Sequence, residues 1–473
     1  MENKTGIRER VKIDLSKCQY SILKEVIKEL KWEQDPSYDP DIIWQDSALT
    51  PGILSSLNPH QRINHFPGMY AISRKDYLAK NLKSMELINP NEFKFFPETW
   101  VMPQELQSLK NYMAVNSPVL IVKPPNLSQG KGIFLTRWIS EILEKSVVQR
   151  YMENPYLIDG FKFDLRMYAL ITGFDPLRVY IHEDGLVRLA TSPYNKPNDN
   201  NLFNVYMHLT NYAINKTSPN YISNKKVSDD FSGHKRSFKA FLQVLEEDGI
   251  NTSKLLSRID DIILKTLCTV QPFLSHIYRS CQPNDSYSAI CFQVLGFDIF
   301  LDSRLHPHLL EVNHTPSFST DSPLDYQIKK SVIKDCLNMI GVKAECSRIY
   351  EEERNNFFAE KLYKSFCRVK NLKSERKDRF LQEQLENETC YMGGYRRIFP
   401  CENDEKYLKY MNDAQAIFSN KKINKPRSES KPLPSMRKST ARRVFKANEV
   451  KFQRRKSCAP KVSLRPSIIH LSI

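Results

Sequence analysis

The segment 308–313, HLLEVN, constrains the fold most strongly, because an apolar strand pattern here ends in a carboxylate and an amide. Upstream, 290–302 alternates like a second strand, and antiparallel pairing of the two about their midpoints sets Asp298 opposite Glu311. Asn313 lies two residues further on and shares a face with Glu311. An unpartnered buried carboxylate costs several kcal/mol, so three oxygen ligands on one patch predict a Mg²⁺ site that also accepts nucleotide phosphates. The alternative is a solvated sheet face, against which the apolar residues of both strands argue.

A glycine-containing loop between two short β runs is a second candidate site. The segment 117–134, SPVLIVKPPNLSQGKGIF, has Lys123 at the end of one apolar run and Gly130 and Gly132 before the next. This order lets backbone N–H groups lie over phosphates while the lysine meets their charge. It is not a Walker loop, because no Gly-Lys-Ser/Thr opens a helix. Taken alone, a GxG hairpin is most often only a turn.

A third candidate is the alternating run that begins at Lys162. Lys162, Asp164 and Arg166 face one way, and the apolar residues between them face the other. The chain then turns back through 182–185, HEDG, and brings Arg188 toward the same charged face. Without further context, an amphipathic strand with a solvated charged face is the simpler interpretation.

The order of segments predicts an α/β or α+β protein. A short amphipathic helix is expected around 22–30, strand-like and helix-like segments alternate over 61–400, and apolar spacing over 254–277 predicts one long packed helix. No apolar run reaches the ~18 residues of a membrane span, and 1–14 has no signal-peptide core. The ten cysteines form no CxxC pair and are expected to be reduced thiols of a cytosolic protein.

The net charge of +16 is concentrated toward the C-terminal end. Residues 421–473 hold sixteen Lys or Arg and two acidic residues, so the rest of the chain is nearly neutral. The composition from about 420 onward predicts disorder, whereas 361–379 lacks Gly and Pro and is predicted to be a helix with a cationic face. Such segments suit an acidic partner, which could be nucleic acid, an anionic membrane or an acidic protein surface.

Several stretches of the sequence, in one order, carry a resemblance to a known family. They include IVKPPNLSQGKGIF, VVQRYM, LIDGFKFDLRMYALIT, MHLTNYAINK, LGFDIFLD and LLEVNHTPSFSTDSPLD. Together they resemble the tubulin tyrosine ligase-like family, in its polyglutamylase branch, over roughly residues 40–400. The resemblance implies an α+β protein whose ATP-grasp catalytic core, with N-terminal, central and C-terminal lobes, occupies 1–350. It also implies a cationic helical microtubule-binding extension in 351–400 and a basic, disordered tail in 401–473.

The resemblance also implies roles for individual residues. ATP would be bound by Lys123, Gln129, Gly130, Lys131, Gly132, Gln149, Arg150, Tyr151, Met152, Lys162, Phe163, Asp164, Thr210 and Asn211. Mg²⁺ would be bound by Asp298, Glu311 and Asn313, and free L-glutamate by Arg188, Tyr212 and Lys235. Arg166 would face the reacting carboxyl group and, with Lys123 and Glu311, carry the catalysis.

The implied reaction is an ATP-dependent ligation. ATP phosphorylates a protein glutamate side chain, and the amine of free glutamate attacks the acylphosphate to form an isopeptide bond. The implied partners are tubulin C-terminal tails and microtubules, with no membrane or nucleic-acid role, and the protein is expected to be a monomer in the cytoplasm and on the cytoskeleton. Whether it works at a cilium or basal body, whether it starts or elongates chains, and which tubulin it prefers stay open at this point.

Three positions depart from the family pattern, and they bear on the alternatives. Relatives usually have Asp, Arg and Ser where this chain has Pro125, Lys131 and Ala213. One alternative is a polyglycylase, although glycine has no side-chain carboxylate for Arg188 and Lys235 to hold. Another is a non-catalytic microtubule-binding protein with a degenerate ligase domain, which the retained metal-site residues argue against. A nucleic-acid-binding protein rests on the basic pI alone and lacks a stacking motif.

Overall fold

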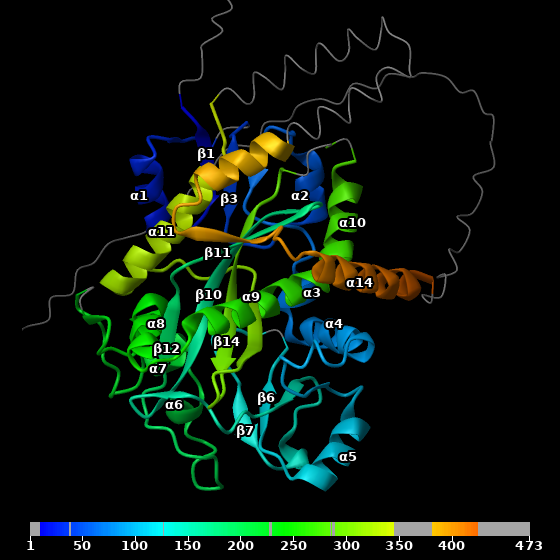
Figure 1. Cartoon of the computed structure of the whole chain (residues 1–473), viewed down its shortest axis with the longest axis vertical. Coiled ribbons are helices and arrows are strands. Elements are labelled where there is room, and N and C mark those ends of the chain that lie inside the picture. The colour runs from blue at the N-terminus through cyan, green and yellow to red at the C-terminus, as the bar shows by residue number, and fades with distance from the viewer. Residues whose placement is uncertain are drawn as a thin grey trace, which may run out of the picture. The chain divides into compact units, whose positions relative to one another are not determined.

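The structure is a computed structural model that describes residues 10–344, apart from 37–38, 126, 227–228, 284 and 286–288, together with residues 381–423. The predicted cationic helix at 361–379 and the tail from 424 onward lie outside the described residues. Figure 1 gives the arrangement of the elements. No helix in the described part of the chain is both long and apolar enough to cross a membrane.

The N-terminal sheet has four parallel strands in the order β2-β1-β3-β4. Its strands are β1 Lys12–Lys17, β2 Glu33–Gln34, β3 Ile42–Gln45 and β4 Arg62–Ile63. The helix predicted around 22–30 is confirmed as α1 Ser21–Glu29. The apolar residues of α1 recur at helical spacing, and they are buried on the helix face that packs against the hydrophobic residues of β1 and β3.

The central sheet has four antiparallel strands in the order β5-β8-β6-β7. The strands are β5 Thr99–Val101, β6 Leu120–Lys123, β7 Phe134–Thr136 and β8 Val147–Arg150. The helix α5 Leu106–Asn116 and the 3₁₀ turn η1 Ile139–Glu141 accompany this sheet. Because β6 and β7 pair directly, the glycine-containing loop predicted between two β runs is the connection between neighbouring strands.

The third, C-terminal sheet is antiparallel and has eight strands. Its strands are β9 Leu157–Ile158, β10 Phe161–Phe174, β11 Leu177–His182, β12 Leu186–Leu189, β13 Lys235–Ser237, β14 Gln293–Leu301, β15 Pro307–Asn313 and β16 Tyr395–Phe399. The long strand β10 pairs with β9, β11, β12 and β14, so its side chains meet those of four neighbours. This position makes β10 the strand on which a shared site can be assembled.

Helices cover the sheets (Figure 1). They are α2 Pro51–Ser56, α3 Tyr70–Ser73, α4 Lys75–Ile88, α6 Val205–His208, α7 Tyr212–Asn215, α8 Phe238–Glu247, α9 Thr252–Cys268, α10 Gln271–Cys281, α11 Pro323–Met339 and α14 Glu405–Ile423. The single helix predicted over 254–277 is wrong, because the chain breaks between α9 and α10. Pro272 stands in the first turn of α10, where its missing N–H is tolerated but where it cannot continue the preceding helix.

The compact body continues beyond the boundaries predicted at 350 and 400. The contacts of the chain divide at Asn424, and 381–423 lies on the near side of that division. Strand β16 pairs with β11 at the edge of the main sheet, and α14 packs against α4, α9 and α10 through buried residues such as Tyr407 and Tyr410. A tail starting at 401 is therefore wrong for this segment, because its apolar side chains belong to the main core.

Candidate active site

The charged face of β10 is buried, which excludes the simpler interpretation of a solvated strand. Lys162 and Asp164 are 8% and 3% exposed. The register aligns Asp164 with Arg188 of β12 and Arg166 with Asp298 of β14. The turn through 182–185 therefore does bring Arg188 to the charged face, and the side chains of three strands meet there.

Two arginines and two aspartates form one buried ion network. Arg188 donates from Nε and Nη2 to the two oxygens of Asp164, both at 2.7 Å, and its Nη2 lies 2.9 Å from Asp298 Oδ2. Arg166 donates from Nε to Asp298 Oδ1 at 2.5 Å and from Nη2 to Oδ2 at 3.1 Å. Burial alone would raise the pKa of Asp298, but Arg166 and Arg188 outweigh it and hold that pKa well below its usual range. Asp298 is therefore ionised at neutral pH.

The predicted strand pairing around the metal candidates is confirmed. Asp298 is the register partner of Glu311, and a β-bulge follows immediately along the pair. Asn313 Nδ2 lies 3.4 Å from Asp298 Oδ2 and 3.3 Å from Glu311 Oε1. An amide N–H group thus faces two carboxylates, and rotating that amide by 180° would turn its oxygen to the same point. The three side chains fit one hard cation with water or phosphate completing its shell.

A lysine that the sequence analysis missed joins this patch. Lys75, the first residue of α4, lies 3.5 Å from Glu311 Oε2 and donates to the carbonyl of Leu127 in the glycine-containing loop. Its side chain is only 13% exposed. Nothing in the spacing around Lys75 distinguishes it from a solvated lysine at a helix start, so only the fold reveals its position.

The phosphate-loop candidates occupy two different environments. Lys123 is buried at the end of β6 and donates to Gln149 Oε1 at 2.7 Å, and burial lowers the pKa of Lys123 to about 8. Gln129 and Lys131 are exposed. Gly130 has φ +79°, and a Cβ there would come within 2.5 Å of Ile214 Cδ1. The loop therefore requires glycine at this position both for its backbone conformation and for its close approach to α7.

A cleft between the central and C-terminal sheets gathers most of the predicted nucleotide-binding residues. Those that line it are Lys123, Gln149, Arg150, Tyr151, Met152, Lys162, Phe163, Asp164, Thr210 and Asn211. Asp298 and Glu311 line the same cleft, so the metal candidates open into it. The loop residues 129–132 are not among its lining residues.

A hydrogen-bond chain forms one wall of the cleft. Lys162 donates from Nζ to the Tyr151 hydroxyl and to the carbonyl of His208, both at 2.9 Å. The Tyr151 hydroxyl lies 2.9 Å from His208 Nδ1, and His208 Nε2 lies 3.0 Å from the carbonyl of Asn201. Burial lowers the pKa of Lys162 to about 7 and that of His208 to about 4, so this imidazole is neutral at pH 7. The sequence analysis did not single out His208.

The residues predicted to hold an amino acid lie together at the side of the network. Lys235 of β13 is the register partner of Arg188, and its Nζ lies 3.4 Å from the centroid of the Tyr212 ring. Lys235 also pairs with Asp325 of α11 at 2.5 Å, and Lys329 lies 3.1 Å from the same carboxylate. Asp325 and Lys329 were not predicted, although their i, i+4 spacing on a helix is a weak signal for a pair.

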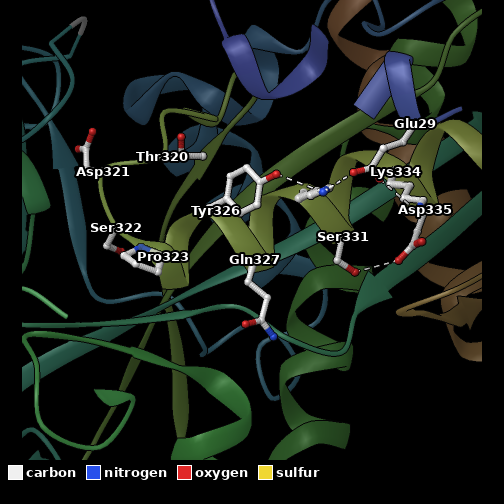
Figure 2. A pocket seen from close by; sticks show the side chains of 11 residues that line it. Glu29, Thr320, Asp321, Ser322, Pro323, Tyr326, Gln327, Ser331, Lys334 and Asp335 are labelled. Atoms are coloured by element: carbon white, nitrogen blue, oxygen red, sulfur yellow. Dashed lines mark hydrogen bonds and ion pairs between the residues drawn. The ribbon is translucent and has the colours of Figure 1, made fainter. Parts of the chain in front are cut away.

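A separate hollow lies on the outer face of α11 (Figure 2). Tyr326 and Lys334 project along this face, and Glu29 of α1 pairs with both Lys330 and Lys334. None of the predicted site residues lines it. The hollow is therefore distinct from the cleft that gathers the nucleotide and metal candidates.

Comparisons with known proteins identify the family of this chain. Residues 53–350 match the model of the tubulin-tyrosine ligase family. A Tetrahymena thermophila protein named "Probable beta-tubulin polyglutamylase" is 42% identical over 415 residues, which cover 85% of this chain and 35% of that protein. Tubulin polyglutamylase TTLL6 of Homo sapiens is 39% identical over 427 residues, which cover 89% of this chain and 47% of that protein. The chain thus spans about a third to a half of the length of these relatives, and it belongs to the tubulin-tyrosine ligase family.

Proposed function

We propose that this protein is an ATP-dependent tubulin polyglutamylase with an ATP-grasp catalytic core, which ligates free L-glutamate to glutamate side chains of tubulin C-terminal tails. The observation that carries the proposal is that Asp298 and Glu311 line one cleft with the buried cation Lys123, while Asn313 Nδ2 lies 3.4 Å from Asp298 Oδ2 and 3.3 Å from Glu311 Oε1. The names of the relatives support tubulin as the substrate. A degenerate ligase domain is not favoured, because every predicted metal-site residue is present and converges.

The cleft supports binding of Mg-ATP. Lys123 and Lys75 supply positive charge beside the metal candidates. The backbone groups of residues 149–152, which also line the cleft, would bind the adenine base. Lys162 has two of its three N–H groups taken by protein acceptors, which leaves one for the nucleotide. Mg²⁺ held by Asp298, Glu311 and Asn313 would neutralise charge on the phosphates.

The proposed chemistry proceeds by two displacements. An oxygen of the acceptor carboxylate attacks the γ-phosphorus, the bond to ADP breaks, and an acylphosphate forms. Arg166 has the charge to face this carboxylate during the first displacement and, during the second, to stabilise the negative charge that develops on its carbonyl oxygen. The amine nitrogen of free glutamate then attacks the acyl carbon, phosphate leaves, and the amine loses its proton as the isopeptide bond forms.

Two cations support glutamate over glycine as the ligated amino acid. Arg188 and Lys235 are neighbours across β12 and β13, and glutamate carries two carboxylates that both can bind. Arg188 already gives Nε and Nη2 to Asp164, which leaves Nη1 as its donor for a substrate. Glycine would leave one of the two buried cations without a substrate partner.

The basic stretches 361–379 and 424–473 suit the acidic tails of tubulin. We accordingly propose microtubules as the partner and the cytoskeleton as the place of action. We do not propose a membrane as a partner.

The test is incorporation of labelled amino acid into purified microtubules. Glutamate and glycine are supplied in parallel with Mg-ATP, and Glu311→Gln is compared with Glu383→Gln, an exposed carboxylate. We expect glutamate incorporation by the wild type and by Glu383→Gln, and none by Glu311→Gln. Incorporation of glycine instead would make the protein a glycylase, and incorporation of neither, with microtubule binding intact, would refute the proposal.

A further inference from the structure

A buried carboxylate at the start of α11 has no role in the chemistry above. Asp325 is 0% exposed and stands three residues after Ser322, which caps the helix by accepting from the Asp325 backbone N–H. Its Oδ2 lies 2.5 Å from Lys235 Nζ, and its Oδ1 lies 3.1 Å from Lys329 Nζ. No hydrogen bond of good geometry reaches Oδ1 among the described residues. A fully buried carboxylate at a helix start is costly, so its two lysines account for its presence.

The three side chains carry one net positive charge. Lys235 and Lys329 are 4% and 6% exposed, and one carboxylate serves both. Lys329 is also tied by its Nζ to the carbonyl of Ser319. A buried group with an excess cation favours an incoming anion, because that anion completes its charge balance. The carboxylates of an amino acid are anions of the right size to do so.

Lys235 is held in direction as well as in charge. Its Nζ lies over the ring of Tyr212 at 3.4 Å from the centroid while it contacts Asp325. Without the carboxylate, this long flexible lysine would keep, among the described residues, the ring and the weaker attraction of the exposed Asp321. The position of the ammonium group beside Arg188 therefore depends on Asp325.

The other charged and titratable groups around Lys235 do not replace Asp325. Arg188 on β12 is a cation, and Lys329 is one as well. Asp321, in the loop before α11, acts on Lys235 more weakly than Asp325 does and is exposed. Burial, with a smaller contribution from the carboxylates of Asp321 and Asp325, raises the pKa of the Tyr212 and Tyr221 hydroxyls and keeps both neutral. Asp325 is the buried anion among these groups.

We propose that Asp325 is a positioning residue that keeps Lys235 charged and directed at the amino-acid site, so that binding of free glutamate depends on it. This inference rests on the proposed function and adds a residue to it. Burial lowers the pKa of Lys235, and the Asp325 charge and hydrogen bond oppose that shift. Removing the carboxylate therefore lowers the pKa of Lys235 further, and the lysine becomes neutral at a lower pH.

The test compares three variants of the full chain by steady-state kinetics on microtubules. Asp325→Asn is expected to raise KM for glutamate about tenfold or more, while kcat at saturating glutamate and KM for ATP stay within about threefold of wild type. Its KM for glutamate should begin to rise with pH at a lower pH than that of wild type. Asp325→Glu, which keeps the charge, should restore the wild-type pH profile.

Ser322→Ala controls for a purely structural effect, because it removes the helix cap and the hydroxyl that donates to Asp325 Oδ2 at 3.3 Å but keeps all three charges of the cluster. If Ser322→Ala reproduces the KM and pH changes of Asp325→Asn, or if Asp325→Asn leaves KM for glutamate unchanged, the proposal is overturned. Calorimetric titration of glutamate into the wild type with a non-hydrolysable ATP analogue separates the polyglutamylase proposal from the proposed positioning role of Asp325. Wild type that binds glutamate without incorporating it refutes only the polyglutamylase proposal, and the Asp325 comparison is then made on the dissociation constant. Wild type that neither binds nor incorporates glutamate overturns both.

Discussion

Substitution of Glu388 tests whether 381–423 is part of the catalytic body. Glu388 is 0% exposed and lies on the helical segment 381–390. Its carboxylate accepts hydrogen bonds from Arg178 Nε at 3.2 Å and from the Tyr180 hydroxyl at 2.5 Å. Arg178 is itself 1% exposed on β11. Glu388→Ala would leave a buried cation without its counter-charge, which typically costs about 3–5 kcal/mol. Arg178 would still donate to the carbonyl and hydroxyl of Thr172, which reduces this cost, while the loss of the acceptor for the Tyr180 hydroxyl adds about 1 kcal/mol. We therefore expect Glu388→Ala to lower the free energy of unfolding by about 4 kcal/mol.

The measurement is urea unfolding followed by tryptophan fluorescence. With a slope of about 3 kcal/mol/M for a large domain, a loss of 4 kcal/mol lowers the midpoint by about 1.3 M. Glu386→Ala is the matched control, because Glu386 is exposed on the same helical segment. The double variant Arg178→Met with Glu388→Leu should lose less than Glu388→Ala, because neither charge is left buried alone. A Glu388→Ala midpoint that matches Glu386→Ala would refute the docking of this segment.

Three further predictions concern the cleft. Lys75→Met should lower kcat at least about tenfold without weakening microtubule binding, whereas Lys80→Met, exposed on the same helix, should leave both unchanged. Gly130→Ala should raise KM for ATP about tenfold or more, because alanine is strained at this positive φ and its Cβ would clash with Ile214 of α7. Gly52→Ala should leave KM unchanged, because a Cβ at Gly52 would meet no atom within 4 Å. Lys162 has a pKa of about 7 when folded and about 10.4 when unfolded, so between these values the unfolded state binds the extra proton and stability rises with pH. The free energy of unfolding of the wild type relative to Lys162→Met should thus increase by about 1 kcal/mol per pH unit from pH 7.5 to 9, and a flat difference would contradict the burial argument.

The strand pairing that brings the proposed metal ligands together could be predicted from the sequence because it depends on local pattern. Alternation places Asp298 on one face of its strand, and the short connection to the next strand fixes antiparallel pairing with Glu311. The turn at 182–185 delivers Arg188 by the same logic. Strand period and hairpin geometry together determine which of these side chains are opposite one another, so no tertiary information is needed.

The remaining parts of the site depend on contacts that sequence spacing does not encode. Lys75 reaches Glu311 because α4 packs beside the loop, and Asp325 reaches Lys235 because α11 packs beside β13. The break before α10 follows from Pro272, whose effect a count of apolar positions overlooks. The two missed contacts share one cause, since each needs the distance between elements that are far apart in the chain, whereas the missed helix break is a local effect.

The site holds its cations in place before any substrate binds, and this changes how Asp164 should be interpreted. Both oxygens of Asp164 are taken, by Arg188 and by the hydroxyl of Thr210 at 2.7 Å, so it has little capacity left to accept from a nucleotide. Its stronger contribution is as the counter-ion that allows Arg188 to be buried. Asp298 serves Arg166 in the same way while it also faces Asn313, with which we propose that it binds Mg²⁺. Anionic substrates then enter a field whose cations are already oriented, so little reorganisation is needed as charge develops during the reaction.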